Sequence, residues 1–131
     1  MAKFTQLEMA KVLSKDSRID IRKSLFGILT TAVYIPTGSK LDVFRNDYNT
    51  GDGETLKQLF ACSEEQLAGF LKKCPTIEPA AMGPARLEGC ISDDHQFAAL
   101  QLFGYSDFSY LPLSEVRIFE GAAAELISTI I

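Results

Sequence analysis

An acidic, glycine-containing segment, residues 47–53 (DYNTGDG), is the first candidate for metal chemistry. A calcium loop of the EF-hand type needs Gly at its position 6 for a sharp turn and a bidentate Glu at its position 12. With Asp47 at position 1, these positions hold Asp52 and Gln58. Both requirements fail, so we predict no calcium site. A loop over 46–53, rich in residues that tolerate positive φ, explains the same residues.

His95 is the single histidine and the obvious candidate for acid–base or metal chemistry. A Cys90–His95 nucleophile pair would need a third group that orients the imidazole, and the sequence identifies none. Asp93 and Asp94 adjoin His95, but three consecutive side chains do not converge easily on one ion. We therefore predict a solvated turn histidine. The sequence also lacks a glycine-rich phosphate loop, an HExxH motif and a GxSxG motif. We predict no catalytic, cofactor-binding or metal-ligating residue, no cofactor, and no enzymatic activity.

The aromatic segment 105–112 (YSDFSYLP) is the best candidate for binding chemistry. Tyr and Phe are enriched at the cores of protein interfaces and among the residues that dominate binding energy. We predict that this segment is a loop, and we select Tyr105, Asp107, Phe108 and Tyr110 as candidate protein-binding residues. The alternative is that these rings cover an open sheet edge as part of the core.

The elements that would position these residues are best defined at residues 64–74. Ser63 and Gln66 have the spacing of a capping box, and Cys62 and Leu67 occupy the positions of a hydrophobic staple. Acidic residues open the segment, basic residues close it, and Pro75 terminates it. We predict a helix over 64–74. For residues 55–62 we prefer a strand to a helix, because the cap at Ser63 requires a non-helical residue there.

Residues before this helix predict two short helices and two strands. Capping-box spacings predict a helix over 6–14 and a second helix that opens at Ser17 and continues through Leu29. Residues 30–35 are β-branched and aromatic and end at Pro36, and residues 40–45 alternate apolar and polar side chains. Both patterns predict strands.

The C-terminal half predicts a hairpin, a third strand and a closing helix. Residues 75–84 form a proline-rich connector. In residues 85–92 apolar or small side chains alternate with a second set that includes Arg86 and Glu88, which predicts a strand with one solvent-exposed (wet) face. Residues 97–103 are apolar on both faces, which predicts a central strand. Residues 93–95 have turn chemistry. A strand over 115–119 and a helix over 122–127 follow. The order predicts one α+β domain over residues 1–131, a mostly antiparallel sheet with helices packed on one face.

Two segments resemble the SseB-type (enhanced serine sensitivity) domain family. The first is residues 32–36 (AVYIP), which follow a predicted helix. The second is residues 59–67 (LFACSEEQL), read as the end of a strand that runs into a capped helix. The resemblance covers roughly residues 20–74. That family has threonine where Ala61 and Cys62 stand here. The resemblance implies an α+β interaction domain and no catalytic residue.

Charge is the main guide to partners. The net charge is −4 and the pI about 5.0, which argues against nucleic acid, because phosphate binding needs a basic face. Residues 1–23 carry six Lys or Arg against three acids, and residues 76–131 carry two Arg against eight acids. A basic segment could contact the acidic region of the same or a neighbouring chain; a solvated face is the preferred interpretation. A protein partner of this acidic region would be basic.

The three cysteines, at positions 62, 74 and 90, are odd in number and have no spacing typical of a disulfide framework or a zinc site. They are therefore consistent with a reducing compartment. Neither a signal core nor an 18-residue apolar run is present, so we expect a cytoplasmic protein without membrane contact. The apolar C-terminus, 127–131, is either docked into the core or buried between subunits of a homo-oligomer.

The sequence is compatible with two functions. The first is a non-enzymatic protein-interaction module, such as a small accessory, inhibitor or immunity-type protein. The alternative is a small-molecule-binding or enzymatic α+β domain with a pocket between sheet and helices.

Overall fold

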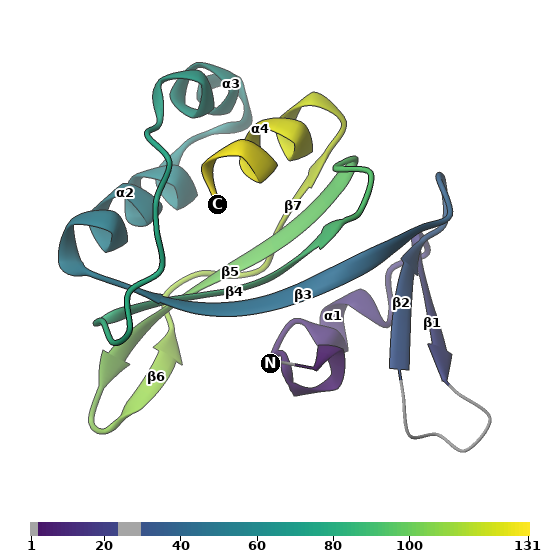
Figure 1. The fold of residues 1–131 in the computed structure, drawn as a ribbon, viewed down its shortest axis with the longest axis horizontal. Helices are drawn as coiled ribbons and strands as arrows, with labels where there is room; N and C mark the ends of the chain where they lie inside the picture. The colour runs from purple at the N-terminus through teal and green to yellow at the C-terminus, as the bar shows by residue number, and fades with distance from the viewer. Residues whose placement is uncertain (1–2, 24–29) are drawn as a thin grey trace.

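A strongly curved antiparallel sheet organises the chain, and three helices cover one of its faces (Figure 1). The computed structural model describes residues 3–23 and 30–131. Its elements are η1 (Phe4–Gln6), α1 (Ala10–Leu13), β1 (Ile19–Lys23), β2 (Thr30–Tyr34), β3 (Ser39–Tyr48), α2 (Thr50–Ala61), α3 (Glu64–Lys73), β4 (Ala85–Ser92), β5 (Phe97–Ser106), β6 (Ser109–Pro112), β7 (Arg117–Glu120) and α4 (Ala122–Ile130). The predicted α+β class is confirmed.

The described strands follow the order β1-β2-β3-β4-β5-β6, and β7 pairs with the other end of β5. Long pairings of β3 with β4 and of β4 with β5 form the centre of the sheet. The predicted hairpin over 85–103 is confirmed, and its turn places His95 at φ 61°. Residues 97–103 are all buried, as expected of a strand with both faces covered.

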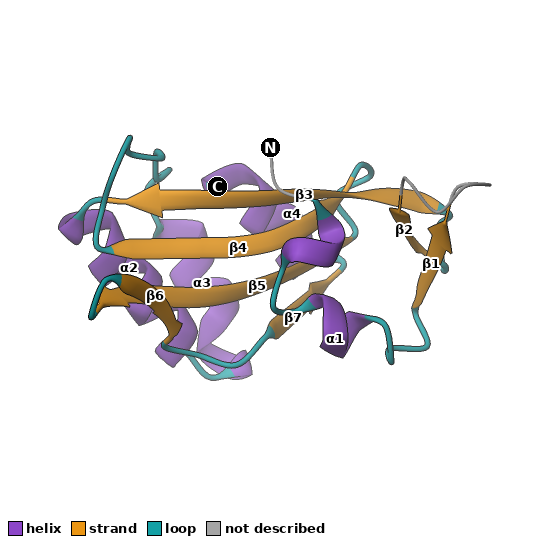
Figure 2. Ribbon diagram, turned by 90° about the horizontal axis from the view of Figure 1, so that it is seen from below, coloured by secondary structure: helices purple, strands orange, loops and turns teal. Residues whose placement is uncertain are grey.

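The first core lies between the sheet and helices α2, α3 and α4, which Figure 2 shows gathered on one side. Alternate residues of the central strands point into it, among them Leu87, Leu100 and Leu102, all at most 2% exposed. Ile127 and Ile130 of α4 are also buried there. The Ile77 N–H donates to the Ile130 carbonyl at 2.9 Å. The apolar C-terminus is therefore docked into the core, the first of its two predicted alternatives.

A second core covers the opposite face of the sheet. Phe4, Leu7, Met9 and Leu13 of the N-terminal segment pack there against strand residues that include Cys90, Phe97 and Ala99. The predicted wet face of residues 85–92 is therefore wrong: Glu88, Cys90 and Ser92 are buried. A segment more than seventy residues earlier covers Glu88 and Cys90, and the Ser92 hydroxyl accepts from the Gln96 and Phe97 N–H groups within its own hairpin.

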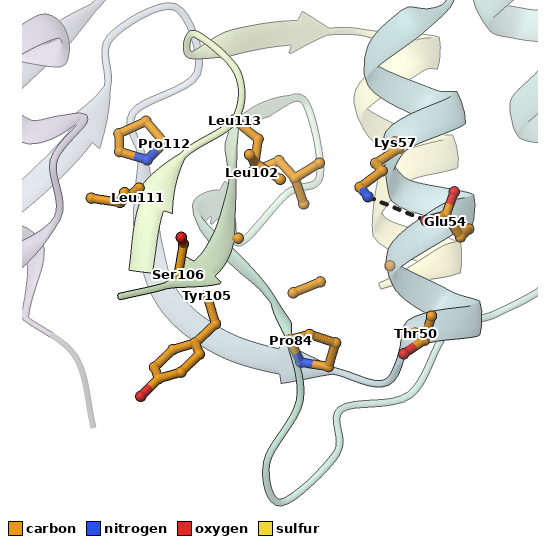
Figure 3. Close-up of a pocket in the computed structure, with 13 residues that line it drawn as sticks. Thr50, Glu54, Lys57, Pro84, Leu102, Tyr105, Ser106, Leu111, Pro112 and Leu113 are labelled. Carbon is orange, nitrogen blue, oxygen red and sulfur yellow. Dashed lines mark hydrogen bonds and ion pairs between the residues drawn. The ribbon is translucent and has the colours of Figure 1, made fainter. Parts of the chain in front are cut away.

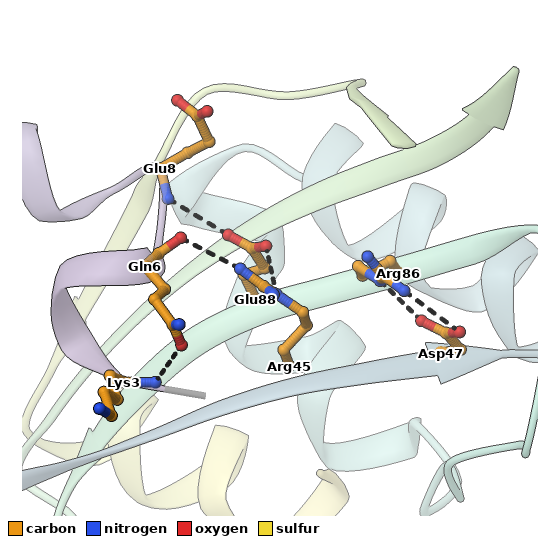
Figure 4. A network of polar contacts seen from close by, with 7 residues as sticks. All are labelled: Lys3, Gln6, Glu8, Arg45, Asp47, Arg86 and Glu88. Carbon is orange, nitrogen blue, oxygen red and sulfur yellow. Dashed lines mark hydrogen bonds and ion pairs between the residues drawn. The ribbon is translucent and has the colours of Figure 1, made fainter. Parts of the chain in front are cut away.

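Glu88 fastens this N-terminal cover. Its Oε2 accepts from Arg45 Nε at 2.8 Å, and its Oε1 accepts from the Glu8 backbone N–H at 3.3 Å. Arg45 Nη2 also donates to the Gln6 carbonyl at 3.0 Å (Figure 4). The Glu88 side chain is 7% exposed, and burial of a carboxylate to this extent is costly without such hydrogen-bond and ion-pair partners.

The predicted strand over 55–62 and the predicted loop over 46–53 are both wrong. Strand β3 runs to Tyr48, and α2 begins at Thr50 because the Asn49 side chain accepts from the Asp52 N–H at 2.8 Å. Cys62 and Ser63 are both extended, and two such residues suffice to end α2 and begin α3. The capping box at Ser63 is present, and the predicted helix over 64–74 is confirmed as Glu64–Lys73.

The two predicted N-terminal helices also need correction. The first is split into η1 and α1, because Leu7 is extended between them. The second is wrong at residues 19–23, which pair with β2 as strand β1; its remainder, 24–29, lies outside the described residues. None of the described helices has the length and apolar character needed to cross a membrane.

A candidate protein-docking hairpin

The aromatic segment predicted to be a loop is a β-hairpin that projects from the end of the sheet (Figure 1). Strand β6 pairs with the last residues of β5, with Tyr105 opposite Tyr110 and Ser106 opposite Ser109. Asp107 and Phe108 form the turn at φ 51° and 66°. Positive φ at both turn residues is the geometry of the tight hairpin turns whose twist matches that of the strands. The loop prediction failed because those turns ordinarily contain Gly or Asn, and Phe108 is neither.

The base of the hairpin is tied to the sheet through Tyr110. Its hydroxyl donates to the Gly83 carbonyl at 2.6 Å and contacts Asp47 Oδ2 at 3.2 Å. The Arg86 guanidinium lies 3.7 Å from the centre of the Tyr110 ring, a close cation–π contact. Asp47 accepts from Arg86 Nε at 2.7 Å.

These contacts are reflected in the titration of both groups. The hydrogen bond to Asp47 raises the pKa of Arg86. Burial, and then the neighbouring carboxylate of Asp47, raises the pKa of Tyr110. The phenol therefore stays protonated and keeps its hydrogen bond to Gly83 across the physiological pH range.

Cross-strand packing stiffens the hairpin further. The Tyr105 and Tyr110 rings meet edge to face with centroids 5.1 Å apart, a favoured arrangement for aromatic pairs. The Tyr105 N–H donates to the Pro84 carbonyl at 2.9 Å. The hairpin is thus held in one orientation from both of its strands.

Phe108, in contrast, packs its large side chain hardly at all against the rest of the described chain. Its side chain is 94% exposed at the tip. A left-handed backbone costs an L-residue other than Gly about 1–2 kcal/mol. A bulky apolar residue that is both strained and exposed weakens the isolated fold, and such local violations concentrate at functional positions.

Several exposed apolar side chains belong to this hairpin or adjoin it in sequence. Among the described residues, seven large apolar side chains are exposed, and four belong to the hairpin or the residue that follows it: Tyr105, Phe108, Leu111 and Leu113. A fifth, Met82, precedes Gly83, whose carbonyl binds Tyr110. Clustered exposure of this kind marks interaction surfaces.

A groove of about 540 Å³ opens beside the hairpin on the helical side of the sheet. Leu111, Pro112 and Leu113 line one wall, and the first half of α2 lines the other, with Lys57 and Glu54 in an ion pair of 3.2 Å (Figure 3). Leu102 and Gly104 of β5 contribute to its floor. The alternative prediction of a pocket between sheet and helices named no residues, because the α2 wall of this groove was assigned partly to a loop and partly to a strand.

The remaining candidates from the sequence do not assemble into a reactive site. Cys90 is fully buried, and burial raises the pKa of its thiol to about 12, so a thiolate is disfavoured. His95 is exposed in its turn. Asp47 is committed to Arg86, and Asp52 lies in the first turn of α2. Over residues 3–23 and 30–131, no group of three or more His, Cys, Asp or Glu side chains is arranged to hold a metal ion.

No family model, curated protein or solved structure matches this chain. Functional assignment therefore depends on the chain's own residues, and the hairpin with its adjoining groove is the feature that the rest of the fold leaves unexplained.

Proposed function

We propose that this protein is a non-enzymatic interaction module that binds another protein through the β5–β6 hairpin. It would act as a small cytoplasmic accessory, inhibitor or immunity-type protein. The observation that carries the proposal is Phe108, which is 94% exposed in a left-handed backbone. The resemblance to the SseB-type family favours an interaction role, although residues 59–62, quoted for it as a strand end, end α2 and form the link to α3.

The hairpin has the properties of an anchor that is organised before binding. Tyr110 is fixed by Gly83 and Arg86, so little conformational entropy remains to be lost when the tip is captured. Asp107 places a carboxylate next to the Phe108 ring. A partner that accepts this tip needs an apolar pocket with a basic rim.

Long-range charge supports the same partner class. Residues 76–131, which contain the hairpin, carry eight acids against two Arg. A basic partner would be steered toward this region, and its association rate would fall with ionic strength.

The test is capture of partners from native lysate on the full chain, with two variants in parallel. We expect Phe108→Gly to lose a stoichiometric partner that the parent retains. Ile35→Ala is the control, because Ile35 is also apolar and exposed, at 53%, but follows β2, outside the hairpin. A partner retained equally by all three proteins would refute docking through the tip.

The groove between α2 and β6 favours a second candidate function, binding of a small molecule. Its volume falls within the range of ligand pockets, and apolar side chains of Leu102, Leu111 and Leu113 line it. A metabolite panel read by thermal shift tests this function. We expect any genuine ligand to lose its shift when Leu111→Trp fills the groove. A shift that persists in that variant would place the ligand elsewhere.

A further inference from the structure

We propose that a second copy of this chain occupies the groove, with the hairpin tip of each copy inserted beside α2 of the other. This inference rests on the proposed function, because it takes the hairpin as the docking element and names one partner for it. The complete interface would be a symmetric homodimer formed without the C-terminus.

Both halves of such a contact lie on one chain and close together. Phe108 supplies an exposed apolar projection, and Leu111 and Leu113 begin the wall of an apolar groove three residues further on. A two-fold axis brings the same surface patch of two copies together, so a projection next to a recess is self-complementary. The tip of one copy then fills the recess of the other, and the reverse contact forms at the same time.

Charge complements this geometry. Asp107 adjoins Phe108 at the tip, and Lys57 stands on the α2 wall of the groove (Figure 3). Lys57 is about half exposed, and among the described residues its ion-pair partner is Glu54, three residues away on the same helix. In the described part of the chain, Asp107 forms no ion pair. Insertion of Phe108 would bring this free carboxylate to the ammonium at the rim.

The edge of β6 disfavours the other simple mode of self-association, continuous strand pairing. This strand has only four residues, and one of them, Pro112, has no backbone N–H to donate. Proline on a short edge strand is a common device against edge-to-edge pairing. Side chains at the tip, rather than backbone groups along the edge, therefore carry the contact.

Dimerisation would also regulate access to the hairpin tip. Self-association buries the same tip that a different protein partner would bind. The homodimer and the heterocomplex would exclude each other, and dilution of the protein would release the tip.

Sedimentation velocity of the full chain, from about 1 μM to about 1 mM, tests the inference. We expect a concentration-dependent dimer. Phe108→Gly should raise the dimer dissociation constant about thirtyfold or more, as for an aromatic hot spot. Ile35→Ala should leave it unchanged.

Charge reversal separates this contact from nonspecific association. Asp107→Lys and Lys57→Glu should each weaken the dimer, and the double variant should restore it, because the pair is then reversed across the interface. A monomer at all concentrations, a dimer indifferent to Phe108→Gly, or a double variant weaker than both single variants would overturn the inference. The proposed function is decided separately by lysate capture, since a monomer that still loses its partner in Phe108→Gly retains that function.

Discussion

Phe108→Gly should make the protein more stable, although it deletes a large apolar side chain. The ring is 94% exposed, so its removal forfeits about 12 Å² of buried area, or about 0.3 kcal/mol. Glycine removes a left-handed strain of about 1–2 kcal/mol at φ 66°. It also gives the unfolded chain more freedom, which costs about 0.5–1 kcal/mol. The balance is a gain of about 0.5 kcal/mol, and the turn becomes Asp-Gly, a preferred hairpin sequence.

Urea unfolding of the parent, Phe108→Gly and Phe108→Ala measures this balance. Alanine loses the ring but keeps a Cβ at positive φ, so it should show no gain and lie about 1 kcal/mol below the glycine variant. The midpoints should differ while the m-values stay equal. If Phe108→Gly is less stable than the parent by about 1 kcal/mol or more, the ring packs within the chain, and the argument from an exposed, strained tip is refuted.

Three further predictions concern the sheet. Leu100→Asp places an unpaired charge where exposure is 0% and should unfold the protein, which circular dichroism would show. A cooperative melt near that of the parent would contradict the burial of this position. Glu88→Gln should cost about 1–3 kcal/mol and speed hydrogen exchange in the N-terminal segment, because the ion pair with Arg45 is lost and one acceptor oxygen replaces the two that bind Arg45 and the Glu8 N–H. Unchanged exchange in that segment would mean that Glu88 does not hold it. A hydrogen bond with the Asp93 side chain, and then burial, raises the pKa of Asp42, so the favourable contribution of this group is present at low pH and lost as pH rises through its folded pKa. Asp42→Asn should therefore stabilise the protein at pH 7 but not at pH 3, measured by thermal melting, and equal effects at both pH values would contradict the raised pKa.

Where a local signal agreed with the tertiary environment, the sequence was a sufficient guide. The capping box at Ser63 and Gln66 forms as its spacing predicts, and the apolar run over 97–103 is the buried centre of the sheet. The capping box depends on interactions within a few residues, so its spacing is visible in the sequence. Burial at both faces of a strand requires a continuous apolar run, which is equally visible.

The errors arose where distant residues decided the outcome. Nothing within β4 indicates that Glu88 and Cys90 are buried, because their cover comes from residues 4–13. Asn49 with Asp52 was an available capping signal for α2, but the glycines at 51 and 53 obscured it. Gly53 is buried against Ala85, and its missing Cβ lets the helix approach the sheet closely.

The candidate site was half predictable. Tyr105, Asp107, Phe108 and Tyr110 were selected on residue type, and the structure brings them together in one hairpin. A pocket between sheet and helices was predicted only as an alternative and without residues, because the walls of the groove come from segments about fifty residues apart and one of them had been assigned to the wrong element.

The second core also sets the order in which the protein can complete itself during synthesis. Phe4 and Leu7 leave the ribosome about ninety residues before Phe97 and Ala99, which belong to the same core. At about 5–20 residues per second, the β5 part of this core becomes available roughly 5–20 s after the N-terminal segment, whereas Ala32, Tyr34 and Leu41 of the same core emerge earlier. Contacts this distant in sequence also slow folding after release. Nascent chains that stall before β5 would lack Phe97 and Ala99, so this core would stay incomplete and they would be clients for chaperones.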